Sequence, residues 1–429
     1  MRLWVAGLLA VFALAARPAR ARLIYELAPL VGGGATENIT ATSDGTTDRF
    51  TDGFVQVSAV GRARYQARMA DSAFGYRIML TRYAKESGLN TIAQSLMATS
   101  SLNLTARLTL RLFASGELTQ TSAVNSIPDP ATAQPQGAVA LGRAYYAISA
   151  SEDMSYSATP RTNFGETLSF ARVNFLDNGI QTTTTNGVTT KHTVGSPATS
   201  VITGLLYGRY ARGRETFSLT GMISDSIAEA PPLTDPNMVV DPLSIGHVFL
   251  AQLLAGWGHE ISQTWSSQVQ AGPAVIFKID GPTVLSPAAL VSFGYSRLPW
   301  FMSFTASQAP TPNLFISEAT VSDQVIARVA MPLGRSENLY VGAFGSYIYA
   351  RLATEGGSLT RAYDQFQGGG SLFYHSQRSP IGGALTYTAL SQRGNGVQTQ
   401  SMAYQSLLLS ISGAFAWGPG TPPLFGGVL

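Results

Sequence analysis

The chain lacks cysteine entirely and contains few charged residues. Of its 429 residues none is Cys, and Asp, Glu, Lys and Arg together make up 12%. Without cysteine the protein can have no disulfide scaffold, no thiolate metal site and no cysteine nucleophile. The charged fraction is about half of the roughly 25% that is typical of soluble domains. Much of the surface is therefore predicted to face something other than water.

The chain also lacks a basic excess once its first residues are set aside. Its formal net charge is +3, and Arg2, Arg17 and Arg20 all lie within the first 21 residues. Without those three arginines, 25 basic residues balance 25 acidic ones. A balanced chain has no overall electrostatic attraction for phosphate backbones, so no nucleic-acid partner is expected.

The first 21 residues predict a cleaved signal peptide. Arg2 gives the positive start, the run from Leu3 to Ala16 is apolar, and Ala19 and Ala21 place small residues at a cleavage site. The alternative is a membrane anchor, but the run is shorter than the roughly 20 residues that span a bilayer. No later apolar stretch of the sequence reaches that length. The exported chain is then predicted to be either secreted or built as a β-barrel.

Apolar and polar residues alternate along several long stretches. From Val55 to Met69 the odd positions are apolar or small, while the even positions are mostly polar. From Phe74 the apolar residues occupy the even positions, as a tight hairpin around residues 70–72 requires. The run from Leu104 to Ala114 alternates in the same way. Runs of about 10 to 16 residues suit tilted strands that cross a membrane better than sandwich strands.

Two classes of connection alternate between these runs. Short links are predicted at 70–72, 102–103, 159–162, 212–214, 261–264, 297–299, 332–337 and 377–379. Longer links, polar or rich in proline, are predicted at about 32–53, 84–90, 120–137, 177–199, 227–244, 279–284, 308–318, 352–362 and 392–401. This alternation is typical of transmembrane barrels, which have tight periplasmic turns and long extracellular loops.

We therefore predict an all-β fold, a transmembrane antiparallel up-and-down β-barrel of about 18 strands, with 16 as the alternative. The signal peptide is assigned to residues 1–21, the barrel to residues 22–417 and a short C-terminal tail to residues 418–429. Such a barrel belongs in the outer membrane of a Gram-negative cell, among lipid and lipopolysaccharide, with both mature termini in the periplasm.

Tryptophan placement gives an indication that is independent of the strand count. The tryptophans beyond the signal peptide are Trp257, Trp265, Trp300 and Trp417. In the predicted topology all four lie where strands meet the periplasmic side, which predicts an aromatic girdle. The alternative is the ordinary preference of aromatic residues for strands.

Motifs for catalysis and metal binding are missing from the sequence. The histidines, His192, His247, His259 and His375, are far apart and provide no metal-ligand pair. The sequence has neither a Gly-x-Ser-x-Gly elbow nor a phosphate-binding loop with its lysine. We expect no enzyme, no cofactor and no metal site. A hydrolase whose Ser and His meet only in space is the alternative.

One group of charged residues forms a candidate site. Six arginines occupy polar positions of the first few runs: Arg62, Arg64, Arg68, Arg77, Arg107 and Arg111. The parity predicts that all six line the lumen as a basic wall, and fixed cations in a water-filled pore concentrate anions. The alternative is that they bind lipid phosphates at the rim or pair with acidic residues. Candidate acids are Asp44, Asp48, Asp52 and Glu26.

The start of the predicted barrel carries a family resemblance. Gly34, Glu37, Asn38 and Ile39 lead through a polar loop to the long alternating run from Phe54. This opening resembles the β-barrel porin family associated with exopolysaccharide gene clusters, and the order of strands and turns agrees over roughly residues 23–176. The resemblance implies an outer-membrane pore. Some members of that family are thought to pass polysaccharide together with a periplasmic export protein.

Three functions are therefore expected. The main one is an outer-membrane pore that acts as the exit channel for a polysaccharide, with a periplasmic polysaccharide export protein as partner. The alternatives are a general diffusion porin for small anionic or neutral solutes, and a filled structural or adhesive barrel whose loops make the contacts.

Overall fold

A computed structural model gives the structure of the chain. It describes residues 22–41, 47–85, 87, 90–120, 144–176, 179–185, 188–194, 198–229, 246–279, 283–297, 300–313, 318–334, 338–353, 359–375, 379–394 and 402–417. The predicted signal peptide and C-terminal tail lie outside these residues. Within them, no helix is both long enough and apolar enough to cross a membrane.

The described chain is almost entirely β-strand. The first strands are β1 (Arg22–Ala41), β2 (Thr47–Ala67), β3 (Ala70–Tyr83), β4 (Thr91–Asn103), β5 (Leu108–Gln120), β6 (Ala144–Thr159), β7 (Thr162–Phe175), β8 (Gly179–Thr185), β9 (Val188–Val194) and β10 (Ala198–Arg212). The others are β11 (Glu215–Glu229), β12 (Gly246–Glu260), β13 (Trp265–Lys278), β14 (Val284–Arg297), β15 (Trp300–Asn313), β16 (Glu318–Pro332), β17 (Leu339–Ala353), β18 (Leu359–His375), β19 (Ile381–Gly394), β20 (Met402–Gly413) and β21 (Phe415–Trp417).

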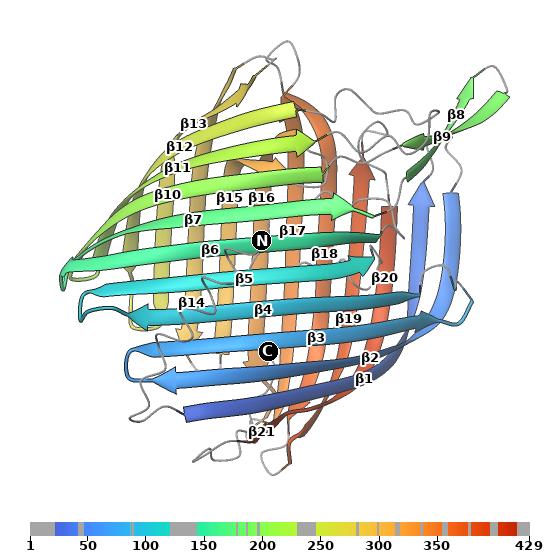
Figure 1. Ribbon diagram of the computed structural model, residues 1–429, viewed down its shortest axis with the longest axis horizontal. Helices are drawn as coiled ribbons and strands as arrows, with labels where there is room; N and C mark the ends of the chain where they lie inside the picture. Colours follow the sequence, from blue (N-terminus) through green and yellow to red (C-terminus); the bar gives the residue numbers. More distant parts are fainter. Residues whose placement is uncertain are drawn as a thin grey trace.

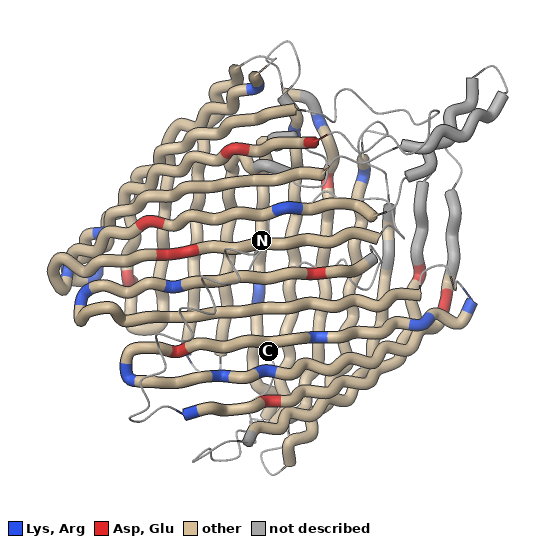
Figure 2. The backbone as a smooth tube through the Cα atoms, viewed as in Figure 1, with Lys and Arg blue, Asp and Glu red and all other residues tan. Residues whose placement is uncertain are grey.

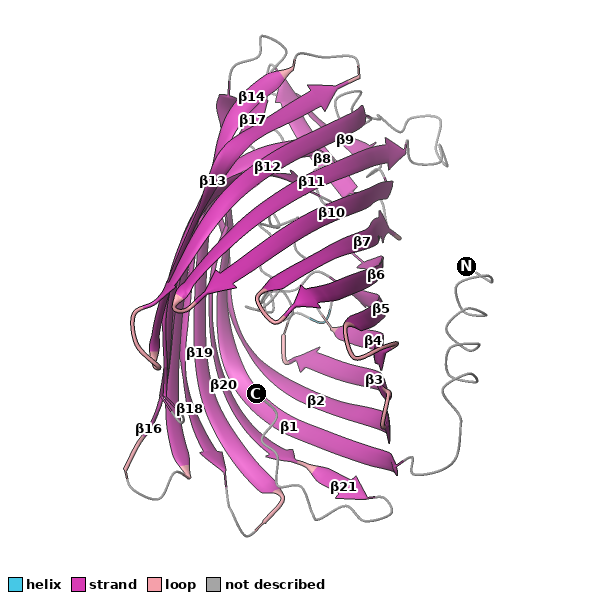
Figure 3. Cartoon of the chain, turned by 90° about the vertical axis from the view of Figure 1, so that its left-hand side faces the viewer, coloured by secondary structure: helices cyan, strands magenta, loops and turns pink. Residues whose placement is uncertain are grey.

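These strands form a closed antiparallel barrel (Figure 1). Each barrel strand pairs with the next along the chain, β7 pairs with β10, and β1 pairs with β2 on one side and with β20 and β21 on the other. Since β20 and β21 pair with successive parts of β1, they occupy one position, and the barrel has 18 strands. The predicted fold and strand number are confirmed. Figure 3 shows β1, β2, β19 and β20 curving together to close the wall.

The alternation of the sequence sets the two faces of the wall. Val57 is 43% exposed on the outside, whereas its neighbour Ser58 is only 7% exposed on the inside. Directly paired residues share a face, and Val57 pairs with Leu80, which is also exposed. The inversion of parity between β2 and β3 is therefore confirmed. The outer face is apolar and the inner face is largely polar, which is the pattern of a barrel set in lipid.

Tight turns gather at one end of the barrel, which we call the short-turn end; the other end is the long-loop end. Turns at 68–69, 160–161, 213–214 and 261–264 agree with the predicted short links to within about two residues. The turn between β4 and β5 differs, because it spans 104–107 and removes Leu104 from the predicted strand. Its Thr105 hydroxyl accepts hydrogen bonds from the N–H groups of Arg107 (3.1 Å) and Leu108 (3.0 Å).

Several of the predicted long links contain strand. The link predicted at 32–53 is wrong, because β1 continues to Ala41 and stays paired with β2 as far as Thr47. Glu37, of the resemblance segment, therefore lies in a strand, opposite Thr51. The link predicted at 177–199 contains the separate hairpin β8–β9. Strand pairing was not predicted in these stretches because their polar residues resemble the composition of a loop.

Glycine allows the barrel to close where β1 meets β20. A Cβ atom at Gly34 would lie 2.0 Å from the carbonyl oxygen of Leu407, and one at Gly32 would lie 2.9 Å from that of Leu409. Side chains at these two positions would force the strands apart. Beyond this close approach, Tyr25 pairs with Trp417, so the last described residues complete the barrel.

Candidate functional site in the barrel lumen

The two halves of the lumen differ in how tightly they are filled. Toward the long-loop end, inner-face residues such as Ser224, Ala274 and Thr388 are buried. Toward the short-turn end, Thr220 and Gln270, on the inner face of β11 and β13, are only partly buried. Along β11 and β13 the lumen is therefore open to water toward the short-turn end and closely packed toward the long-loop end.

The hairpin β15–β16 contributes to the packed half. Pairing between β14 and β15 stops at Ala289 and Gln308, although β15 continues to Asn313. Beyond that point β15 and β16 approach β12. One buried cluster joins Val321 of β16 to Val248, Leu250, Ile276 and Val284. The free end of the hairpin thus covers the inner face of β12 to β14 and reduces the space in the lumen.

Four of the six predicted arginines lie on the inner wall. Arg62 and Arg64 of β2, Arg77 of β3 and Arg111 of β5 all occupy positions opposite in parity to the exposed apolar residues. Arg68 and Arg107 do not belong to this wall, which corrects the prediction. Arg68 lies in the turn at 68–69 and Arg107 in the turn at 104–107, because both hairpins turn within the runs that were read as continuous strand.

Three of the four arginines of the wall have a carboxylate partner. Arg64 makes a forked contact with Asp71, with Nε–Oδ1 at 2.9 Å and Nη2–Oδ2 at 2.5 Å. Two looser ion pairs flank it: Arg62 Nη1 lies 3.7 Å from Glu26 Oε2, and Arg111 Nη1 lies 3.9 Å from Asp153 Oδ1. The charged residues of β2 to β6 are marked in Figure 2. Of the acids predicted as alternative partners of the arginines, Glu26 therefore does pair, with Arg62.

The remaining candidate acids behave differently. Asp52 is buried and accepts hydrogen bonds from the backbone N–H of Lys85, at 3.1 and 2.9 Å. Asp44 and the side chain of Asp48 lie outside the described residues. Sequence reasoning missed Asp71 and Asp153 as partners. Asp71 belonged to the predicted turn at 70–72, whereas Asp153 comes into reach only through the pairing of β5 with β6.

The charged wall encloses a space of about 430 Å³. Arg62, Arg64 and Arg111 line it together with Asp71 and Asp153. The Arg111 side chain is 67% exposed, so its guanidinium is accessible to lumenal water. A site of this kind can hold a small ion or polar solute through exchangeable contacts, without closing around it.

A second stretch of the inner wall is polar and carries little charge. A space of about 620 Å³ beside β10 to β14 is lined mainly by hydroxyl and amide side chains: Thr216, Ser218, Thr220, Ser266, Ser267, Gln268, Gln270 and Ser292. Arg209 and Glu260 add one charge of each sign. This wall offers hydrogen bonds to neutral solutes, whereas the first wall offers fixed charges.

The described tryptophans lie on the outer face at the short-turn end. Trp257 and Trp300 are exposed, and the Trp265 ring lies 4.6 Å from that of Tyr295. The Trp257 indole N–H donates to Glu215 Oε2 at 2.5 Å. For Trp417 only the backbone is described, and it belongs to the same end. This placement is that of an aromatic girdle; that this end faces the periplasm stays a prediction.

No metal or enzymatic centre emerges from the part of the chain that the structure describes. It contains no group of three or more His, Asp or Glu side chains that could hold a metal ion. His247 contacts Asp225, and His259 contacts Glu215 at 2.6 Å, both on the outer face. The side chains of His192 and His375 lie outside the described residues. The expectation of no enzyme, no cofactor and no metal stays a prediction.

Comparisons with known proteins find similarity only among solved structures. No protein-family model matches the chain and no curated protein matches its sequence. The crystal structure of Acinetobacter baumannii OccAB3 is similar at 10% identity, covering 93% of this chain and 100% of that chain, with a TM-score of 0.46. Pseudomonas aeruginosa OccK7 (OpdD) is similar at 11% identity, covering 93% of this chain and 100% of that chain, with a TM-score of 0.46. P. aeruginosa OpdQ is similar at 12% identity, covering 93% of this chain and 98% of that chain, with a TM-score of 0.43.

Proposed function

We propose that this barrel is a diffusion pore of the bacterial outer membrane for small anionic or neutral solutes. The observation that carries the proposal is the water-accessible lumenal wall around Arg62, Arg64 and Arg111, in a barrel of 18 strands. A barrel of this size leaves space for an aqueous channel, and side chains fixed on its wall select solutes by charge.

The outer face supports the membrane setting. It is apolar, and aromatic residues mark its short-turn end. Both ends of the described chain lie at that end, since Arg22 pairs with Gln66 and Trp417 pairs with Tyr25. By analogy with outer-membrane barrels we place the short-turn end in the periplasm and the long-loop end outside the cell, with lipid and lipopolysaccharide around the belt.

The expected selectivity is moderate and depends on the looser ion pairs. Arg64 is neutralised closely by Asp71, but the contacts of Arg62 and Arg111 exceed hydrogen-bond length. Their fields therefore extend into the open half of the lumen, where confined water screens less than bulk solvent. Small anions should be enriched there, while neutral solutes pass unhindered.

Current through single molecules in a planar bilayer tests this function. In a salt gradient the reversal potential should indicate a preference for anions, and Arg62→Gln with Arg111→Gln should move it toward cations, most strongly at low salt. Arg107→Gln is the matched control, because that arginine lies in a turn. An unchanged potential in the double variant would remove the role assigned to the wall. A protein that never conducts would favour the alternative of a filled structural or adhesive barrel. The close packing of the long-loop half would then be part of that filling.

A second candidate function is the exit of a polysaccharide supplied by a periplasmic export protein. The wall of hydroxyl and amide groups along β10 to β14 favours it, because neutral sugars exchange hydrogen bonds easily with such side chains. The resemblance of the first barrel segment to the exopolysaccharide-associated family points the same way. Under this function long neutral oligosaccharides should enter and transiently block the current, whereas a pore for small solutes should exclude them.

A further inference from the structure

Two glutamates lie on the outer face of the barrel, where apolar residues predominate. Glu152 of β6 pairs with Leu112 and Leu168, and Glu166 of β7 pairs with Met154 and Leu206. Leu168 and Leu206 are 47% and 65% exposed on the outside. Since directly paired residues share a face, both carboxylates point outward.

The two glutamates lie within the apolar belt. We call two directly paired residues of neighbouring strands a rung. The exposed aromatic pair Phe164 and Tyr156 forms the rung on the short-turn side of the glutamates. Glu166 lies on the next rung, and Glu152 lies one rung farther on. A step of two residues along a strand is roughly 7 Å, so the carboxylates begin about 7 and 14 Å along the strands from the aromatic rung. Carboxylates at this depth face hydrocarbon if nothing else covers them.

Other outward carboxylates of this chain have a partner of their own. Their contacts are Glu215 with His259, Asp225 with His247, Glu229 with Arg172, Asp323 with Arg351, and Asp364 with Arg361. Among the described residues, no hydrogen bond or ion pair is made by Glu152 or Glu166. Among the described residues, the fold gives each of these outward acids a side-chain partner and leaves Glu152 and Glu166 for something outside the chain.

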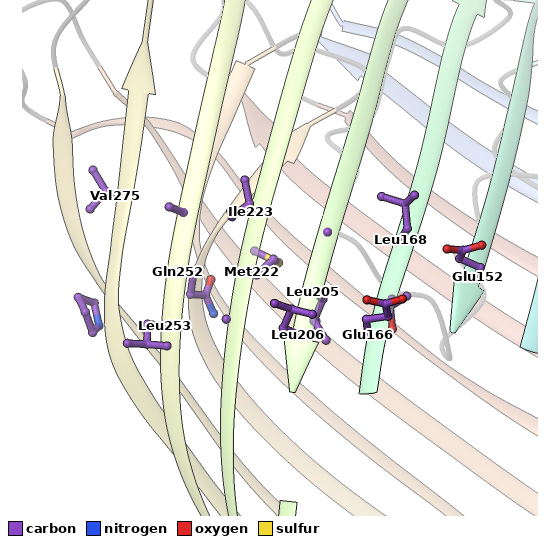
Figure 4. Close-up of a pocket in the computed structure, with 15 residues that line it drawn as sticks. Glu152, Glu166, Leu168, Leu205, Leu206, Met222, Ile223, Gln252, Leu253 and Val275 are labelled. Atoms are coloured by element: carbon purple, nitrogen blue, oxygen red, sulfur yellow. The ribbon is translucent and has the colours of Figure 1, made fainter. Parts of the chain in front are cut away.

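A groove adjoins the two glutamates on the same face. Its volume is about 590 Å³, and Figure 4 shows Glu152 and Glu166 toward one end and Val275 toward the other. Its floor includes Gly204 and Gly221, between the exposed side chains of Leu206 and Ile223. A Cβ atom at Gly204 would meet nothing within 4 Å. The barrel itself therefore does not need glycine there, and the space opens outward.

We propose that this face binds a membrane-embedded segment of a partner protein, which places apolar side chains in the groove and a Lys or Arg side chain against Glu152 and Glu166. Charge complementarity specifies the chemistry, because a cationic side chain offsets the cost of holding two carboxylates in an apolar belt. Small floor residues between larger ones let a partner backbone approach closely.

A second copy of this chain fits the site poorly. Outward basic residues of the described strands all lie within three residues of a strand end: Arg82, Arg172, Arg212, Arg297, Arg351, Arg361 and Arg393. A copy inserted in the same orientation would therefore present apolar residues, or its own glutamates, at the depth of Glu152. The occupant is a different protein.

Photocrosslinking in cells that make the protein natively tests the proposal. A photoreactive side chain replacing Leu206 should give an adduct with one other protein, and the same group replacing Leu385, on the outer face of β19, should not. Adding Glu152→Gln and Glu166→Gln should lower the adduct at least about tenfold, as removal of a buried charge partner does. An adduct of two copies of this chain, an adduct with lipid alone, or a yield indifferent to the glutamates would each overturn the proposal.

Two further measurements keep the test independent of assembly. Gly204→Leu should fill the groove and abolish the adduct, while Gly61→Leu, which is equally unobstructed on β2, should leave it intact. In the purified barrel, without a partner, Glu152→Leu with Glu166→Leu should raise the unfolding temperature in lipid vesicles. An unchanged or lower temperature would mean that the carboxylates are already satisfied, and the proposal would fail. Pore conductance should not change, because neither residue faces the lumen.

Discussion

On the inner face of the wall Arg62, Arg64 and Arg111 each stand beside a carboxylate of a neighbouring strand, whereas on the outer face Glu152 and Glu166 have no basic neighbour in the described chain. Strand β6 carries a residue of each set, Asp153 on the inside and Glu152 on the outside. Water in the lumen tolerates charges that are paired only loosely, but a hydrocarbon belt does not. A charge on the inner face can therefore interact with lumenal water and solutes, while a charge on the outer face requires a partner.

The largest expected effect is a contrast between the two faces of β11. Leu219→Arg places a cation on the apolar outside, where an arginine costs up to about 2 to 4 kcal/mol at the bilayer midplane and less toward the aromatic girdle, and it should destabilise the assembled barrel. Thr220→Arg, its neighbour on the open inner face, should cost much less, because the guanidinium reaches lumenal water. Equilibrium unfolding from lipid vesicles measures both. Equal losses would erase the distinction between the faces.

An intermediate effect on stability tests whether the two halves of the inner face differ in packing. Ala274 is 1% exposed in the packed half, so Ala274→Leu should overpack it and cost about 1 to 3 kcal/mol. Gln270→Leu lies on the same face of β13, four residues toward the open half, and should be nearly neutral. The same unfolding measurement compares them. If the two variants match, the long-loop half is not packed as described.

The smallest expected effect on stability concerns the charged wall. Asp71→Asn removes the partner of Arg64, and because both side chains are about a third or more exposed, the loss should stay below about 1 kcal/mol. The consequence for conduction should be clearer, since one more uncompensated cation faces the lumen. Anion preference in the planar bilayer should rise at low salt. A fall in that preference would contradict the assignment of Arg64 to the pore.

Local pattern determined the walls of this barrel. Alternation with a period of two depends only on neighbouring residues, so the outward position of Val57 and the inverted parity of Leu80 could be predicted without any contact information. Tight turns could be placed for the same reason, because their residues set the backbone directly. The error at Arg107 shows the limit of this reasoning: alternation continues through a turn when the turn residues happen to alternate too.

Tertiary structure decided everything that depends on strands far apart in the sequence. The carboxylate beside Arg111 is supplied by Asp153, 42 positions later, and the buried neighbours of Val321 come from β12, β13 and β14. Sequence pattern alone predicted a wall of about 18 strands with one apolar and one polar face, since burial against lipid or water acts on each residue separately, and the structure settled the number at 18. Which charges neutralise one another, which half of the lumen is filled, and which outward acids are left unpaired follow only from strand pairing and register, because those place side chains within reach of each other.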